Sequence, residues 1–195
     1  MQFDLYLDEV KDFANIQREI SESISGVEWQ DRVYENYRLG RWKVHSLTDS
    51  GFCKNIIIDL NLKSFEQELD SHIKEFCGDR SYTIVSSWLS KFDNGDHGML
   101  HDHGNADIAG VYYYKTTGSD GSIYFAEAGG WPFTPIEAND KSHLTAEEGK
   151  IILFPGYASH GITMNTTDVE RISLSFNIEF TKIIPKAVPI STKVL

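Results

Sequence analysis

Cysteine, basic side chains and long apolar runs are all scarce in this chain of 195 residues. The only two cysteines, Cys53 and Cys77, have no metal-type spacing, and we expect free thiols in a reducing compartment rather than a disulfide framework. Lysine and arginine together number 18 against 29 acidic residues, which gives a net charge of −11. Nucleic acids and anionic membranes both select basic surfaces, so neither is an expected partner.

No apolar run approaches the ~20 residues that a transmembrane helix needs. The first ten residues contain neither a basic segment nor a long apolar segment of the secretory type, so we expect a cytoplasmic protein. Internal repeats and linkers rich in proline or glycine are also missing. What is present is a hydrophobic fraction of 41% with 12% aromatic residues, which suffices for a real core.

The first eighty residues carry a helical hydrophobic period. Apolar side chains recur at intervals of three and four through residues 8–24 and again through residues 64–77, which predicts two amphipathic helices. Their predicted inner faces are Val10, Phe13, Ile16 or Gln17, Ile20 and Ile24 in the first helix, and Phe65, Leu69, Ile73 and Phe76 in the second.

Local signals add detail to this N-terminal part. Ser64 with Gln67 resembles a capping box at the start of the second helix, and Gly78 is placed to end it. Residues 2–7 alternate apolar and polar side chains, and residues 55–60 form a short apolar run, so both are predicted as strands.

From residue 81 onward the hydrophobic period becomes two, which indicates strands. The predicted strands are 82–92, one through 101–103, 108–115, 122–126, 151–154, 158–164 and 171–180. Residues 129–143 are rich in turn formers and predict a long irregular loop, a kind of segment that often carries function. Many short strands separated by turns favour a barrel or sandwich, with the two helices against its outer face.

We therefore expect one domain over residues 1–195. Residues 1–80 would form a support of helices and strands, residues 81–180 the β core, and residues 181–195 a C-terminal tail.

Three histidines are candidate metal ligands. His101 and His103 stand two apart, a spacing that aims both side chains at the same face of a strand. Two convergent imidazoles are a common way for a sheet to bind a metal, and His160 is a third candidate from a later strand. Each histidine taken alone is equally consistent with an ordinary packing or surface role.

The strand predicted at residues 171–180 has an unusual alternation. Arg171, Ser173 and Ser175 occupy one face, and apolar side chains occupy the other. Either the polar face points to solvent, or it lines the interior and binds an anion. A buried arginine would need an anionic partner, because an uncompensated buried charge is costly.

The order of these motifs resembles the 2-oxoglutarate- and iron(II)-dependent oxygenases. The resemblance covers residues 81–180 and rests on Trp88, Gly95, His101, His103, Ala109-Gly110-Val111-Tyr112-Tyr113, Glu148-Gly149, Leu153-Phe154-Pro155, His160 and Arg171-Ile172-Ser173-Leu174-Ser175-Phe176-Asn177. It implies a mainly β, double-stranded β-helix fold of the jelly-roll or cupin type. It also implies Fe(II), 2-oxoglutarate and O₂ as cofactor and co-substrates.

The same resemblance implies roles for particular residues. His101, His103 and His160 would bind the metal, while Arg171 with Ser173 would bind the distal carboxylate of 2-oxoglutarate. Tyr112 and Tyr114 share a face of their strand, and either phenol is a candidate to reach the same carboxylate. The implied reaction is hydroxylation of a small molecule or peptide, and a homodimer is compatible with the sequence.

One departure from the common oxygenase pattern leaves alternatives open. That pattern places a carboxylate where this chain has His103. The metal site could use three histidines, or take a carboxylate from Asp102 or Asp107, or bind a metal other than iron. The alternative function is a cupin-like metal-binding barrel that works without 2-oxoglutarate, as a dioxygenase, an isomerase or a binding module.

Overall fold

Two antiparallel sheets form the centre of the computed structural model, which describes residues 3–25, 29–34, 40–45, 55–126 and 143–181. The larger sheet has the order β1 (Tyr6–Glu9), β9 (Lys150–Pro155), β6 (Ile108–Lys115), β11 (Arg171–Phe180), β4 (Tyr82–Phe92), β3 (Gly40–His45) and β2 (Gln30–Tyr34). The smaller sheet has the order β5 (Gly98–His101), β10 (His160–Ile162), β7 (Ser122–Phe125) and β8 (His143–Thr145).

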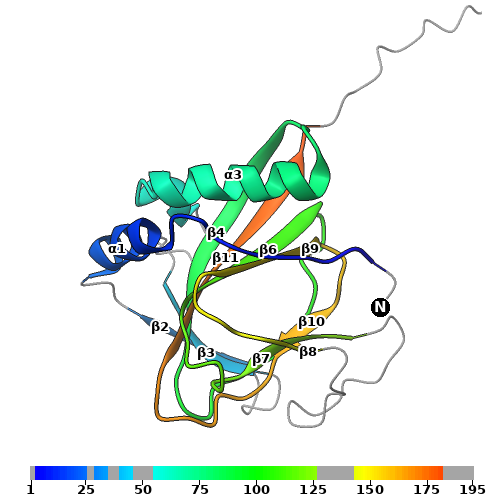
Figure 1. The fold of residues 1–195 in the computed structure, drawn as a ribbon. Helices are drawn as coiled ribbons and strands as arrows, with labels where there is room; N and C mark the ends of the chain where they lie inside the picture. Colours follow the sequence, from blue (N-terminus) through cyan, green and yellow to red (C-terminus); the bar gives the residue numbers. More distant parts are fainter. Residues whose placement is uncertain (1–2, 26–28, 35–39, 46–54, 127–142, 182–195) are drawn as a thin grey trace, which may run out of the picture.

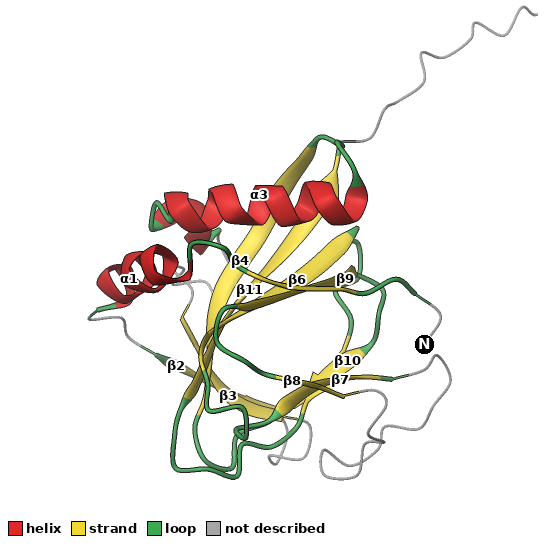
Figure 2. Cartoon of the chain, viewed as in Figure 1, coloured by secondary structure: helices red, strands yellow, loops and turns green. Residues whose placement is uncertain are grey.

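The larger sheet is covered on both faces. Helices α1 (Phe13–Ile24), α2 (Ile56–Asp59) and α3 (Lys63–Cys77) lie on one face, and the smaller sheet lies on the other (Figures 1 and 2). One apolar core therefore joins the helices to the larger sheet, and a second core fills the space between the sheets. Within the described ranges, no helix has the length and apolarity needed to cross a membrane.

The β core follows the prediction closely. Strands β4, β6 and β11 have the predicted bounds, and α3 begins one residue before its predicted start. The N-terminal part adds β1 to one edge of the larger sheet and β3 with β2 to the other. A strand was predicted only for residues 2–7, and β1 overlaps that range at Tyr6 and Leu7 alone. The first helix, predicted from residue 8, begins at Phe13. Cys53, residues 129–142 of the predicted loop and the tail from residue 182 lie outside the described residues.

The predicted strand at residues 55–60 is wrong, because Ile56–Asp59 forms the short helix α2. A run of three isoleucines fits a strand and a buried helical turn equally well. Contacts with β4 favour the helix here: the Ile57 amide donates to Ser87 Oγ at 3.0 Å, and Asn55 Nδ2 donates to the Ile84 carbonyl at 2.8 Å.

The inner faces of the two long helices are mostly as predicted. Ile16, Ile20, Phe65, Leu69 and Ile73 are all fully buried. Phe13 is the exception, since 39% of its surface stays exposed where it lies beside the backbone of Gly149.

The predicted capping box at the start of α3 is also wrong. Ser64 lies inside the helix, and the residue at the cap position, Leu62, makes no side-chain hydrogen bond to the helix. Instead the carboxylate of Glu19 in α1 accepts hydrogen bonds from the Ser64 amide at 2.8 Å and the Phe65 amide at 3.0 Å. A carboxylate from a neighbouring helix therefore satisfies the exposed amides of α3.

We expect Glu19→Ala to lower the free energy of unfolding by about 1–2 kcal/mol, because two helix amides lose their acceptor. Urea unfolding followed by circular dichroism measures this loss. Glu22→Ala removes the same charge from an exposed position of the same helix and should change stability by less than about 0.5 kcal/mol. Equal effects of the two substitutions would contradict a capping role for Glu19.

Candidate metal centre

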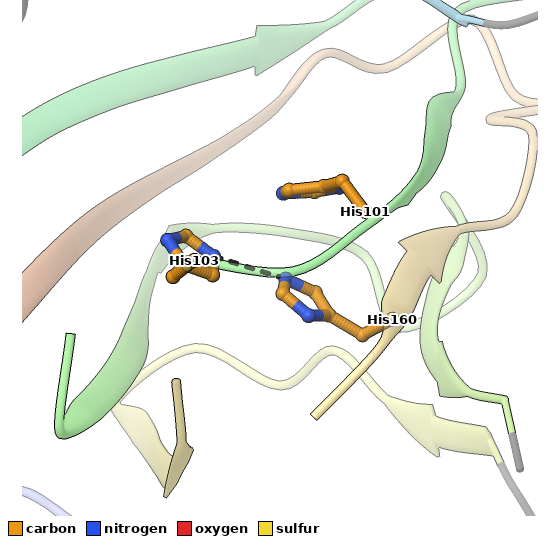
Figure 3. Close-up of side chains that lie close together, drawn as sticks. All are labelled: His101, His103 and His160. Atoms are coloured by element: carbon orange, nitrogen blue, oxygen red, sulfur yellow. Dashed lines mark hydrogen bonds between the residues drawn. The ribbon is translucent and has the colours of Figure 1, made fainter. Parts of the chain in front are cut away.

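Three histidine side chains converge at one end of the space between the sheets (Figure 3). His101 ends β5 and His160 begins β10, and the two residues are direct partners in the pairing of these strands. Their ring centroids are 4.4 Å apart, and the ring of His103 lies 5.2 Å from His101 and 5.0 Å from His160. One nitrogen from each ring lies within 4.8 Å of the others, a spacing that fits one shared metal ion.

His103 reaches this cluster from a turn, not from the predicted strand. Strand β5 ends at His101, and the chain then turns through Gly104, whose φ of 57° lies in the left-handed region. The turn is held by two hydrogen bonds: the Gly104 amide donates to Asp102 Oδ1 at 2.9 Å, and the His103 amide donates to the Gly156 carbonyl at 2.8 Å. The spacing of two residues still brings both histidines to one point, but through a loop.

Hydrogen bonds commit two of the rings to the same tautomer. Nδ1 of His101 lies 2.8 Å from the Met99 carbonyl oxygen, and Nδ1 of His160 lies 2.9 Å from the Ala158 carbonyl oxygen. A carbonyl can only accept, so Nδ1 carries the proton and Nε2 keeps a free lone pair. His103 turns its own Nε2 to within 3.3 Å of Nε2 of His160.

The environment keeps the imidazoles of His103 and His160 neutral. Burial lowers the pKa of His103 to about 4, and the neighbouring His101 acts in the same direction. Burial likewise lowers the pKa of His160 well below its usual value, and the other two rings add to the effect. Neutral imidazole is the form that binds metals, so the site needs no large change in protonation to accept one.

The carboxylates that were alternatives to His103 lie elsewhere. Asp102 Oδ1 accepts the Gly104 amide, and Asp107 Oδ2 accepts the Phe180 amide at 2.7 Å. Among the described residues no aspartate or glutamate joins the three histidines in a group that could hold a metal.

Arg171 and Ser173 face the space between the sheets and are fully buried. The alternative in which the polar face of this strand points to solvent is therefore wrong for Arg171 and Ser173. The apolar residues that alternate with them on β11 pack under the helices. Nη1 of Arg171 donates to the Gly121 carbonyl at 3.0 Å, and its guanidinium carbon lies 4.3 Å from the ring centroid of Phe92. Nε and Nη2 are buried without a hydrogen-bond partner in the described part of the chain.

The tyrosine predictions chose the wrong face of β6. Tyr112 packs in the helical core, with its ring 5.1 Å from that of Phe65, and Tyr114 packs against the same core. Tyr113 is the inward residue: it lies opposite Ser173, and its hydroxyl is buried without a hydrogen-bond partner in the described chain. Burial raises the pKa of Tyr113 to about 12, although Arg171 acts against this rise.

The sequence held one signal that would have separated the two faces. Gly110 shares the face of Tyr112, and a Cβ there would lie only 2.3 Å from the ring of Phe176. A glycine inside a strand often marks such a close approach by a large neighbour. The face of Gly110 and Tyr112 is therefore the crowded one under the helices.

The histidine cluster lies beside one part of β11, and Arg171 lies at the start of the same strand. Trp88 on β4 is the pairing partner of Ser175 on β11, and its indole stacks against His103 with 5.8 Å between ring centroids. Ser175 is four residues from Arg171, which is ~13 Å of strand. An arginine side chain and an extended five-carbon dicarboxylate can together span such a separation.

These features fit a divalent metal and a dicarboxylate. Three imidazoles present convergent nitrogens, and a buried guanidinium has donors that only an acceptor from outside the described chain would satisfy.

Comparison with protein families gives one match. Residues 86–177, a little under half of the chain, match the model of the family described as "Putative 2OG-Fe(II) oxygenase", in which 2OG stands for 2-oxoglutarate. The matched segment runs from β4 to β11 and includes the three histidines, Tyr113 and Arg171. The family resemblance expected from the sequence is therefore confirmed. No curated protein matches the chain by sequence.

Several solved structures share the fold. An oxidoreductase of the 2OG-Fe(II) oxygenase family from Burkholderia pseudomallei has a TM-score of 0.66 and 11% identity, covering 90% of this chain and 84% of its own. HygX from Streptomyces hygroscopicus, with nickel and 2-oxoglutarate bound, gives 0.62 and 10%, covering 90% and 82%. A prolyl hydroxylase from Trichoplax adhaerens, in complex with a hypoxia inducible factor peptide fragment, gives 0.60 and 11%, covering 89% and 82%. The predicted double-stranded β-helix is thereby confirmed.

Proposed function

We propose that this chain, whose residues 86–177 belong to the 2OG-Fe(II) oxygenase family, hydroxylates a small molecule or a peptide while 2-oxoglutarate is decarboxylated to succinate. Enzymes of this family use Fe(II), 2-oxoglutarate and O₂. One observation carries the proposal for this chain. The same space between two sheets contains three convergent imidazoles and, further along β11, a buried guanidinium with unpartnered donors.

In this proposal His101, His103 and His160 are the iron ligands. Three ligands on one side of the metal leave three positions open, which suits a chelating 2-oxo acid and O₂. Arg171 binds the distal carboxylate of 2-oxoglutarate through Nε and Nη2, because these two donors form a fork that matches a carboxylate. The hydroxyls of Ser173 and Tyr113 lie beside Arg171 and supply further donors.

Activation of O₂ and oxidative decarboxylation are the chemistry that iron and 2-oxoglutarate supply when bound. The contribution of the chain is to hold them in a fixed relation and to exclude water. The rings of Phe125 and Phe154 pack against His160, with centroids 6.0 and 4.7 Å away, and so shield that side of the site.

Anaerobic titration tests the proposal directly. Addition of Fe(II) should give one equivalent of bound metal, and subsequent 2-oxoglutarate should produce the visible metal-to-ligand charge-transfer band of a chelated 2-oxo acid. Succinate, which has the second carboxylate but no 2-oxo group, is the control and should give no band. Bound iron without a band at saturating 2-oxoglutarate would refute the co-substrate assignment.

The three-imidazole ligand set also favours a second candidate function. Cupin-like barrels that bind metals through histidine and work without 2-oxoglutarate would suit it equally well, as dioxygenases, isomerases or binding modules. The buried Arg171 favours the 2-oxoglutarate-dependent oxygenase over this second function. The same anaerobic titration distinguishes the two functions.

The proposed setting of the enzyme follows from weaker observations. The acidic composition disfavours nucleic acid and membranes as partners, and Cys77 forms no disulfide within the described residues, consistent with the cytoplasm. Residues 1–80 would serve as a support for the β core within one domain, and a homodimer is compatible with these features.

A further inference from the structure

The third histidine is held differently from the other two. Nδ1 of His101 and Nδ1 of His160 each contact a carbonyl two residues earlier in the chain. His103 lies beyond its strand and has no equivalent carbonyl contact among the described residues. Its Nε2 faces His160, so Nδ1 lies on the other side of the ring. If Nε2 binds a metal, the proton of the neutral ring must lie on Nδ1, and Nδ1 then needs an acceptor of its own.

Asn177 offers that acceptor. It lies opposite Ala109 on the face of β11 that looks into the space between the sheets. Its Nδ2 donates to Ser86 Oγ on the neighbouring strand at 3.0 Å, which fixes the amide plane and turns Oδ1 the other way. Oδ1 is buried and completes no hydrogen bond of standard geometry in the described chain.

Neighbouring side chains place Asn177 near His103. Trp88 lies two residues after Ser86 on β4 and stacks on His103. Phe154, the partner of Ala109 on β9, has its ring centroid 6.3 Å from that of His103. Asn177 raises the pKa of His103 against the effect of burial, which is the action of an acceptor near the ring. Metal binding at Nε2 would commit the proton of a neutral imidazole to Nδ1, and the buried, unpartnered Oδ1 of Asn177 would be an acceptor for it.

We propose that Asn177 is a positioning residue for the metal site: its Oδ1 accepts the Nδ1 proton of His103 and directs Nε2 to the metal. The inference rests on the proposed function and deepens it. Asn177 would provide from β11 what a backbone carbonyl provides for His101 and His160, because the turn after β5 removes His103 from such a carbonyl. The amide is uncharged, so it orients the ring without adding charge to the site.

Co(II) titration under anaerobic conditions tests this role, because the visible spectrum of Co(II) reports both affinity and coordination number. Asn177→Leu keeps the shape of the side chain and removes the acceptor, so Co(II) affinity should fall ~10–100-fold, the usual effect of losing a partner of a metal-bound histidine. Asn177→Asp keeps an acceptor and should retain most of the affinity.

The His103→Ala background separates positioning from general structural damage. If Asn177 acts through His103, Asn177→Leu should cause no further loss of Co(II) affinity in that background. Wild-type affinity in Asn177→Leu, an equal loss in Asn177→Asp, or a loss that persists without His103 would each overturn the inference. Failure of the wild-type chain to bind Co(II) would instead refute the proposed metal site itself.

Discussion

His101→Ala and His160→Ala should each abolish stoichiometric binding of Fe(II). Each change removes one of three protein ligands, and the described residues hold no carboxylate in the cluster that could replace it. Loss of a ligand should therefore exceed the ~10–100-fold effect expected for a residue that only orients one. Anaerobic gel filtration followed by metal analysis measures the iron retained per chain.

His97→Gln is the matched control for these variants. His97 is a buried histidine four residues before His101, but it does not belong to the cluster. This variant should retain one equivalent of iron. Full iron retention in His101→Ala or His160→Ala would contradict the ligand assignment.

His103→Asp tests whether residue 103 is the third metal ligand. The common oxygenase pattern has a carboxylate at this position, so the variant should keep iron, whereas His103→Ala should lose most of its affinity. Undiminished iron binding by His103→Ala would show that the third protein ligand is not His103.

Arg171→Ala should weaken 2-oxoglutarate binding by at least ~10-fold while leaving Fe(II) affinity nearly unchanged. A hydrogen bond to a charged group contributes about 1.5–3 kcal/mol, and the fork would make more than one in a water-excluded site. Arg171→Lys should also bind weakly, because an ammonium cannot reproduce the fork. Titration of the anaerobic Fe(II) protein with 2-oxoglutarate measures both effects, and unchanged affinity in Arg171→Ala would make the cupin-like reading the better one.

Two tyrosines that are neighbours in sequence provide an internal control for the same site. Tyr113→Phe removes a buried hydroxyl beside Arg171 and should reduce 2-oxoglutarate affinity by a smaller factor than Arg171→Ala. Tyr112→Phe removes a hydroxyl from the opposite face of β6, in the helical core, and should leave the affinity unchanged. Similar losses in both variants would indicate a general effect on the strand.

The sequence predicted the parts of the site that depend on local periodicity. His101, Arg171 and Ser173 lie on strands whose side-chain alternation is fixed by the backbone, so the sequence placed Arg171 and Ser173 on one face of β11 but left open whether that face points inward. Alternation alone did not give the face of β6 either, because Tyr112, Tyr113 and Tyr114 are all compatible with a buried strand, and only Gly110 marks the crowded face. The register shift between β6 and β11 beside Tyr113 depends on strand pairing, which periodicity does not encode.

The contacts that sequence reasoning missed are between elements. Glu19 caps a helix that begins 44 residues later, and the partner that we propose for Asn177 is His103 in the turn after β5. No sequence pattern around Glu19 or Asn177 indicates these contacts. The helix α2 was missed for a related reason, since its hydrogen bond to Ser87 decides between two conformations that three isoleucines leave open.

The two unpartnered donors of Arg171, Nε and Nη2, also bear on folding. Buried donors without an acceptor destabilise the ligand-free chain, and a bound dicarboxylate would remove that cost only from the folded form. A ligand that binds the native state alone shifts the unfolding equilibrium in proportion to the logarithm of its concentration relative to its Kd. The metabolite supply of the cell would then help to set how much of this protein stays folded, in addition to how fast it turns over.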